Sequence, residues 1–157
     1  MKTLIIAYSY SGNTRKIADI IQELTGATQI GIEPVEPYPS SYNACVKQAK
    51  QEVNSGFEPE IKPFAVNLDD YETVFIGSPV WWYTFSPPIR TVLSGYGNWR
   101  GKTVYPFATH GGGIGSTFED YRRFCEGANV KPLLDVYFNG NTHRKSEQEI
   151  KSWIDTV

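Results

Sequence analysis

The sequence has few cysteines, little net charge and no long apolar run, and each of these shortages excludes a class of protein. Its two cysteines, Cys45 and Cys125, form neither a Cys-x-x-Cys nor a metal-ligand spacing, so we predict no disulfide framework and no metal site. The formal net charge of −2 argues against a nucleic-acid partner and gives no reason to expect a membrane surface. The apolar run after Met1 is too short for a signal peptide, and no stretch reaches membrane-spanning length. We therefore expect a cytoplasmic protein without membrane insertion.

Two common nucleotide-binding motifs are also missing. The P-loop needs Gly, four residues and Gly-Lys-Ser/Thr, the dinucleotide fingerprint needs Gly-x-Gly-x-x-Gly, and neither stands at the first strand-to-helix turn. That turn instead reads Ser9-Tyr10-Ser11-Gly12-Asn13-Thr14, here called the Ser/Thr loop. Residues 2–8 before it indicate a buried parallel strand. A helix closed by Gly26 is predicted after it from apolar residues at helical spacing: Ile17, Ile20, Ile21 and Leu24.

The Ser/Thr loop has the chemistry of a phosphate site. The first N–H groups of a helix are unpaired and lie at the positive end of the helix dipole, and the hydroxyls of Ser9, Ser11 and Thr14 add donors. Gly12 lets a ligand approach the backbone closely. Because no Lys or Arg lies inside the loop, the site suits a monophosphate better than a triphosphate. The alternative is a plain turn followed by a helix cap, which the same residue types form.

Along the remaining chain, apolar segments alternate with segments of helical period. Further strands are predicted at 28–33, 73–77, 101–108 and 133–138, although Pro106 cannot donate a hydrogen bond in its strand. Helices are predicted to begin near residues 41, 88, 116 and 146, the last two with a capping box. The last helix carries its apolar residues at helical spacing: Ile150, Trp153, Ile154 and Val157.

This alternation predicts one α/β domain, residues 1–157, built as a doubly wound parallel sheet with helices on both faces. In such a sheet, ligands bind beyond the carboxyl ends of the strands, at the point where the strand order reverses. The loops after the first, third and fourth strands would all open at that edge.

The loop after the third strand, residues 78–88 or the Trp loop, contains two adjacent tryptophans, Trp81 and Trp82. Neighbouring side chains of an extended chain point to opposite faces, so the two rings cannot easily enter one core. We expect at least one of them to contact a ligand, because a large flat ring stacks well on a planar heterocycle. The alternative is that both rings pack over the irregular segment 57–70.

The loop after the fourth strand, residues 109–116 or the Gly loop, has glycine at four of its positions: 111, 112, 113 and 115. Without side chains, the backbone can lie against a flat ligand with its N–H groups aimed at ring oxygens. The same absence leaves that face of the ligand uncovered. The alternative is a mobile surface turn.

The Ser/Thr loop closely resembles the FMN phosphate loop of flavodoxins, commonly written Thr/Ser-x-Ser/Thr-Gly-x-Thr. The Trp and Gly loops stand where that family places its two isoalloxazine-binding loops, so the resemblance covers essentially the whole chain. It implies a flavodoxin-like sandwich, a five-stranded sheet in the order 2-1-3-4-5, and FMN as cofactor. The residues that it implies for cofactor binding are Ser9, Ser11, Gly12, Asn13, Thr14, Pro79, Val80, Trp81, Trp82, Tyr83, Thr84, Thr109, His110, Gly111, Gly112 and Gly113.

Two features depart from the electron-carrier flavodoxins. Those proteins are typically strongly acidic, whereas this chain carries a net charge of only −2. They also usually place an aromatic residue in the third loop, where this chain has His110-Gly111-Gly112-Gly113. With one flavin face open, a nicotinamide or a quinone could stack there for hydride transfer. The chain therefore looks closer to the flavodoxin-like relatives of NAD(P)H and quinone oxidoreductases.

The sequence thus predicts an FMN-binding redox protein that accepts hydride from NAD(P)H and passes electrons to a small quinone-like acceptor. His110 is the candidate catalytic residue, because it is the ionisable side chain at this edge that exchanges a proton near neutral pH. The alternative is a loop histidine that is hydrogen-bonded to its own surroundings.

Two other functions fit the same architecture. One is a one-electron carrier between redox protein partners, which strong acidity would have favoured. The other is a non-redox module such as a phosphoacceptor receiver domain. A receiver needs an acidic pair after the first strand and an Asp at the end of the third, where this chain has Ser9-Tyr10 and Gly77-Ser78.

Overall fold

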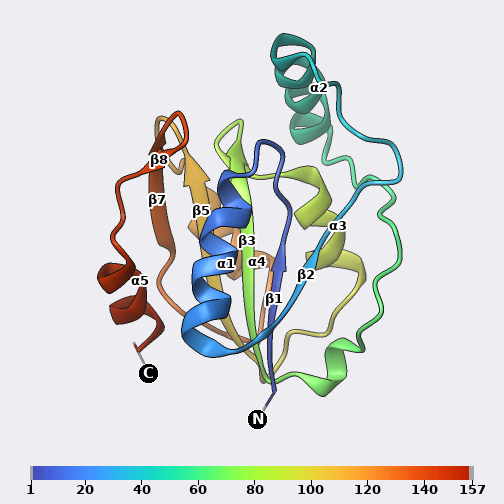
Figure 1. Cartoon of the computed structure of the whole chain (residues 1–157). Helices are drawn as coiled ribbons and strands as arrows, with labels where there is room; N and C mark the ends of the chain where they lie inside the picture. The colour runs from blue at the N-terminus through green and yellow to red at the C-terminus, as the bar shows by residue number, and fades with distance from the viewer. Residues whose placement is uncertain (1, 156–157) are drawn as a thin grey trace.

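The chain folds around one curled sheet with helices on both sides (Figure 1). The computed structural model describes residues 2–155. Its helices are α1 (Asn13–Thr25), α2 (Tyr42–Ser55), α3 (Pro87–Gly95), α4 (Thr117–Phe124) and α5 (Glu147–Ile154), with a short 3-10 helix, η1 (Leu68–Asp70). Its strands are β1 (Thr3–Ala7), β2 (Thr28–Gly31), β3 (Thr73–Trp81), β4 (Thr84–Phe85), β5 (Thr103–His110), β6 (Asn129–Val130), β7 (Leu134–Asn139) and β8 (Thr142–His143).

The long strands run parallel in the spatial order β2-β1-β3-β5-β7, which confirms the predicted doubly wound fold and its strand order. Short β6 pairs in parallel with β5, whereas β4 and β8 fold back antiparallel on β3 and β7. The register places Ala7 beside Gly77 and Gly77 beside Phe107. Because the central strands therefore reach the same level, the loops that follow them open at one edge.

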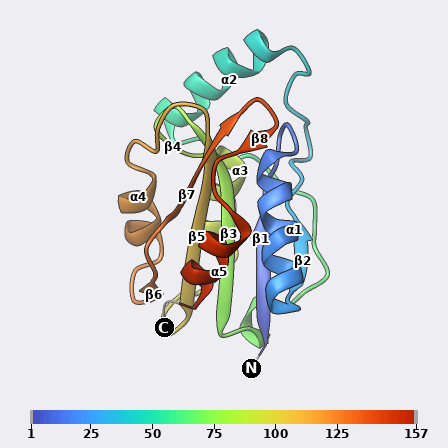
Figure 2. The same cartoon turned by 60° about the vertical axis from the view of Figure 1, so that its left-hand side comes forward.

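Each face of the sheet has its own core. α1 and α5 cover one face, where Ile17 and Ile21 pack with Phe107 and Ile150. α3 and α4 cover the opposite face, which is richer in rings and contains the buried Tyr121 (Figures 1 and 2). Full burial of a large apolar side chain is worth about 1.5–3 kcal/mol, so these two layers fix the sheet that carries the loops.

Pro106 lies in β5, as predicted, despite its missing N–H group. It pairs with Ile76 of β3 on one side. On the other side, pairing with β6 ends at Val104 and pairing with β7 begins at Phe107. The proline therefore stands where that ladder is interrupted, and the strand loses little by it.

α2 lies flat on neither face of the sheet. Figures 1 and 2 show it beyond the carboxyl ends of the strands, across the edge where the three loops meet. Cys45 and Ala49 are its buried residues. The helix begins after Ser41, whose Oγ accepts a hydrogen bond from the Ala44 N–H group, and ends at Gly56. The sequence predicts its length but not its place.

The two predicted capping boxes have different outcomes. Ser146 and Glu149 form the reciprocal bonds of a capping box at the start of α5, as predicted. The box predicted at Ser116 is wrong, because the Ser116 hydroxyl donates to the Tyr83 carbonyl and to Asp120 instead. Val157, expected on the apolar face of the last helix, lies outside the described residues. No helix within residues 2–155 is both long enough and apolar enough to span a membrane.

Candidate functional site

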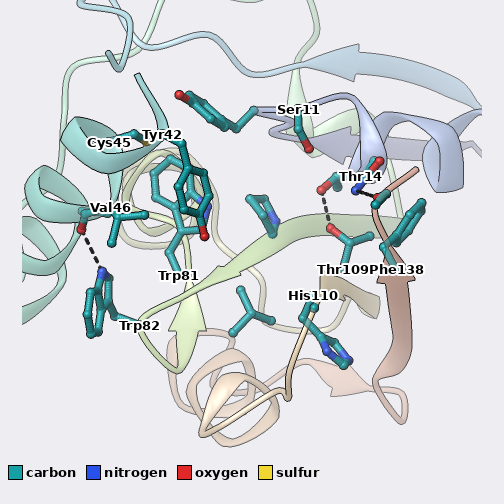
Figure 3. A pocket seen from close by; sticks show the side chains of 17 residues that line it. Ser11, Thr14, Tyr42, Cys45, Val46, Trp81, Trp82, Thr109, His110 and Phe138 are labelled. Carbon is teal, nitrogen blue, oxygen red and sulfur yellow. Dashed lines mark hydrogen bonds between the residues drawn. The ribbon is translucent and has the colours of Figure 1, made fainter. Parts of the chain in front are cut away.

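A pocket of about 680 Å³ lies at the carboxyl edge of the sheet, within the size range of small-molecule sites (Figure 3). Its lining includes most of the residues predicted for cofactor binding: Ser11, Asn13, Thr14, Pro79, Val80, Trp81, Trp82, Thr109, His110 and Gly111. The other predicted residues lie outside the lining: Ser9, Gly12, Tyr83, Thr84, Gly112 and Gly113. All three predicted loops therefore contribute, each with part of its residues.

The Ser/Thr loop combines a helix cap with an exposed donor. The Ser9 Oγ accepts hydrogen bonds from the N–H groups of Gly12 at 3.1 Å and Arg15 at 3.2 Å. Ser9 thus orders the turn. This is the role of a plain turn and helix cap, the alternative interpretation of the loop from its sequence. Gly12 has φ of 98°, a left-handed conformation that glycine adopts without strain. Ser11 stays exposed on the pocket side, and among residues 2–155 its hydroxyl has no hydrogen-bond partner.

A buried hydrogen bond joins the Ser/Thr loop to the Gly loop. The hydroxyls of Thr14 and Thr109 lie 2.7 Å apart, and both residues are buried (Figure 3). Beside them, the Asn13 Nδ2 donates to the Gly140 carbonyl at 3.1 Å. The Asn13 Oδ1 is buried without a partner in the described part of the chain. An unpaired buried acceptor costs about 1–3 kcal/mol, so a ligand that brings hydroxyl donors to this corner of the pocket would be stabilised.

The Trp loop is a tight hairpin rather than an extended segment. Val80 pairs with Phe85 and Trp81 with Thr84, which leaves Trp82 and Tyr83 as a two-residue turn. Both turn residues have positive φ, 51° and 72°. Two positive φ values in succession are those of a type I′ turn, which normally contains Asn or Gly. We call β3, β4 and this turn the Trp hairpin.

The two tryptophans have separate environments, as the sequence predicts for adjacent rings. Trp81 makes edge-on contacts with three tyrosines, Tyr8, Tyr10 and Tyr38, with ring centroids 4.9–5.8 Å apart. Trp82 points toward α2, where its Nε1 donates to the Val46 carbonyl at 2.9 Å. Trp81 is therefore fixed by packing at the pocket wall, and Trp82 attaches the hairpin to α2.

The tip of the Trp hairpin is held against the Gly loop by backbone and side chain. The Tyr83 carbonyl accepts a hydrogen bond from the Ser116 N–H group at 2.7 Å. Thr84 donates to Asp120 of α4 at 2.6 Å, which draws its hydroxyl away from the pocket. A Cβ on Gly115 would lie 2.4 Å from the Tyr83 carbonyl oxygen, so this glycine is required by the close approach.

His110, the predicted catalytic residue, stands at the end of β5. Its Nε2 is hydrogen-bonded to Asp135 of β7, and its Nδ1 is buried without a partner in the described part of the chain. In Figure 3 its ring points away from Trp81. The bond to Asp135 favours the tautomer with the proton on Nε2, which leaves Nδ1 as an acceptor.

Sequence reasoning misses one wall of the pocket. The additional lining residues are Tyr10, Phe138, Gly140 and four residues of α2: Tyr42, Cys45, Val46 and Ala49. The helical spacing of Tyr42, Val46 and Ala49 marks the apolar side of the helix, but that signal does not tell a pocket from a core. Burial raises the pKa of the Cys45 thiol, so the wall is uncharged at neutral pH.

Comparisons with known proteins agree with this geometry. The Flavodoxin family model matches residues 2–157. A protein designated a flavoprotein from Bacteroides eggerthii DSM 20697 is 31% identical, with a TM-score of 0.84 over 99% of this chain and 97% of that chain. A flavoprotein from Lactobacillus acidophilus NCFM, solved in complex with FMN, is 26% identical, with a TM-score of 0.77 over 98% of this chain and 99% of that chain.

More distant structures share the fold. Two-electron reduced flavodoxin from Megasphaera elsdenii is 14% identical, with a TM-score of 0.62 over 96% of each chain. No curated protein sequence matches. Because the family model spans residues 2–157 and the 31% identical flavoprotein covers 99% of the chain, the chain belongs to the flavodoxin family.

Proposed function

We propose that this protein uses FMN for redox chemistry, taking hydride from NAD(P)H and passing electrons to a small acceptor such as a quinone. The cofactor is FMN, which the family match and the FMN complex of the Lactobacillus flavoprotein both support. When bound, FMN supplies the electron chemistry, and the protein's residues bind it and orient it.

The observation that carries the proposal is the shape of one pocket. It begins at the N-terminus of α1 with the exposed Ser11 hydroxyl and ends against the fixed indole of Trp81. A helix N-terminus suits a phosphate, and an indole suits a planar ring. The buried Asn13 Oδ1, beside Thr14 at the start of α1, offers an acceptor to a ligand hydroxyl. The pocket therefore has groups that suit the phosphate, the ribityl chain and the ring of FMN.

Each loop then has a proposed binding role. Ser11, Thr14 and the first N–H groups of α1 hold the phosphate, while Ser9 and Gly12 shape the turn that presents them. Trp81 flanks the ring. Gly111 brings its backbone to the polar edge of the ring. Gly112 and Gly113 are exposed and carry no side chain, which supports access of a second planar molecule from that side.

We propose a proton-exchange role for His110. Asp135 holds its Nε2, so a proton can be taken up at the free Nδ1 and returned to a reduced acceptor. Asp135 is half exposed, so this pair can exchange protons with solvent. Its position at the end of β5 places this exchange beside the glycines that leave the pocket open.

The test is anaerobic reduction of the FMN-loaded protein. We expect NADH or NADPH to bleach the visible flavin absorption rapidly in stopped-flow measurements, with oxidation by a soluble quinone in a second mixing step. Gly112→Leu, which places a side chain on the open side, should slow the bleaching while the Kd for FMN stays within about twofold, since a Cβ there meets nothing within 4 Å.

Each outcome separates the hypotheses. Flavin that binds but stays oxidised with both nicotinamides overturns the hydride step and favours a one-electron carrier between protein partners. Failure to bind FMN overturns the assignment of all three loops.

A further inference from the structure

One aromatic residue at the pocket differs from the rest. The aromatic rings on the lining are those of Tyr10, Tyr42, Trp81, Trp82, His110 and Phe138. All except Tyr42 contact another ring, through Trp81, Tyr83, Tyr137 or His143. Among residues 2–155, the Tyr42 ring contacts no other ring and its hydroxyl has no hydrogen-bond partner. Tyr42 is therefore the lining ring that neither a ring contact nor a hydrogen bond within residues 2–155 holds in place.

Tyr42 lies at the outer end of the α2 wall. It is the first residue of the helix and is 74% exposed, whereas Cys45 and Ala49 on the same side are 4% and 2% exposed. Residues three and seven positions apart share one face of a helix, so Tyr42 continues the buried wall to the mouth of the pocket. Both Tyr42 and Trp81 line the pocket, and in the view of Figure 3 the Tyr42 ring projects from α2 in front of Trp81.

No second aromatic ring is fixed opposite Trp81 by the hairpin or by the Gly loop. Trp81 is locked by its three tyrosine contacts, and Trp82 is turned to the Val46 carbonyl. The Gly loop contributes Gly111, which has no ring. A planar ligand beside Trp81 thus has one aromatic neighbour in place and one face left for another.

We infer that Tyr42 is a cofactor-binding residue whose ring stacks on the outer face of the flavin until a nicotinamide or quinone displaces it. This inference rests on the proposed binding of FMN in the pocket. Because Tyr42 has no ring contact or hydrogen bond to give up, moving onto the ligand costs it only rotamer freedom. Offset stacking of two aromatic systems repays that cost. The residue from α2 thereby supplies the aromatic contact that the Gly loop lacks.

The experiment is an FMN titration of Tyr42→Leu followed by flavin fluorescence. We expect a Kd roughly three- to tenfold above wild type, in line with the usual strength of aromatic pairs. We also expect brighter bound FMN, because a stacked tyrosine quenches flavin emission. Tyr42→Trp should keep both the affinity and the quenching, whereas Tyr42→Phe should keep the affinity but lose the quenching, because excited flavin is quenched by electron transfer from a phenol or indole ring.

Tyr96→Leu is the matched control. Tyr96 is 43% exposed, follows α3 and contacts Phe64, away from the pocket. Its replacement should leave the Kd for FMN and the fluorescence unchanged. Thermal unfolding of each apo-protein checks that Tyr42→Leu is folded, as expected for so exposed a side chain.

The failures of the inference and of the proposed function are distinguishable. If wild-type protein does not bind FMN, the proposed function is overturned. If wild type binds FMN and Tyr42→Leu binds it with the same Kd and the same quenching, the inference about Tyr42 alone is overturned.

Discussion

The Ser/Thr loop and the Trp hairpin border the same pocket, and both contain residues in the left-handed backbone conformation. The types of residue that adopt it differ. The Ser/Thr loop uses Gly12, with φ of 98°, where a glycine carries no strain. The Trp hairpin uses Trp82 and Tyr83, with φ of 51° and 72°, although Asn and Gly are the favoured residues of such a turn.

The difference indicates what each loop is for. A non-glycine residue in this conformation costs about 1–3 kcal/mol, and such strain persists where the surrounding structure enforces it. Here the enforcement comes from the Val46 carbonyl on Trp82 and from Ser116 on the Tyr83 carbonyl. The Ser/Thr loop presents backbone and small polar groups, so glycine serves it. The hairpin presents rings, and it places Trp81 and Trp82 at the pocket despite the strain of its turn.

The largest expected effect comes from separating the hairpin and the Gly loop. Gly115→Val should lower the free energy of unfolding by about 3 kcal/mol, because φ is +54° and a Cβ would clash with the Tyr83 carbonyl. Urea denaturation measures it. Gly112→Val is the control, with nothing within 4 Å of its Cβ, and should stay within about 0.5 kcal/mol. Equal stabilities of the two variants would contradict the anchoring at Tyr83.

On the other side of the comparison, the Ser/Thr loop depends on its buried hydrogen bond. Thr14→Val leaves the buried Thr109 hydroxyl without its partner, so we expect a loss of about 2 kcal/mol in unfolding free energy. The double variant Thr14→Val/Thr109→Val should recover part of that loss, because both polar groups are removed together. A double variant that is less stable than Thr14→Val would show that the pair contributes otherwise than by this bond.

The two left-handed positions can then be tested directly, first by giving the Ser/Thr loop a side chain. Gly12→Ala should lose about 1 kcal/mol, since its Cβ has free space and only the backbone conformation opposes it. Gly31→Ala is the control, because that glycine also has free space but lies in strand β2 and lacks a positive φ. If both variants are equally stable, the backbone at Gly12 is less constrained than its φ indicates.

The smallest effect is expected from giving the hairpin a glycine. Tyr83→Gly should raise the unfolding free energy by about 0.5 kcal/mol, because relief of strain slightly exceeds the added entropy of the unfolded chain. Tyr96→Gly, at φ of −115°, has no such strain to release and should be destabilised. Thermal melts of both variants decide the sign.

Much of the fold could be predicted because the patterns are local and repeated. The buried strands read as short apolar runs, and Ile17 and Ile21 mark the face of α1 that packs on the sheet. Once parallel strands are predicted, their carboxyl ends must share an edge, so the positions of the three loops follow. Thr14 and Thr109 are thereby expected at the same edge, although they lie 95 positions apart in the chain.

Other parts depend on contacts that the sequence does not show. Trp82-Tyr83 has no Asn or Gly, so nothing in the turn predicts a hairpin there. The Ser116 hydroxyl donates to the Tyr83 carbonyl because the hairpin lies beside it. This hydrogen bond takes the place of the predicted capping box. The place of α2 is set by a proline-containing linker and by Trp82, so its wall of the pocket could not be predicted from its own apolar face.

The polar contacts of the Ser/Thr loop also determine when this loop can be completed during translation. Asn13 donates to the Gly140 carbonyl at 3.1 Å and Lys16 to the Asn141 carbonyl at 3.0 Å, across 127 and 125 positions of sequence. The Ser/Thr loop is therefore completed by a turn that leaves the ribosome 125–127 positions later. A ribosome-bound chain that has not yet released β8 lacks these contacts, so we expect FMN to bind only after β8 has emerged.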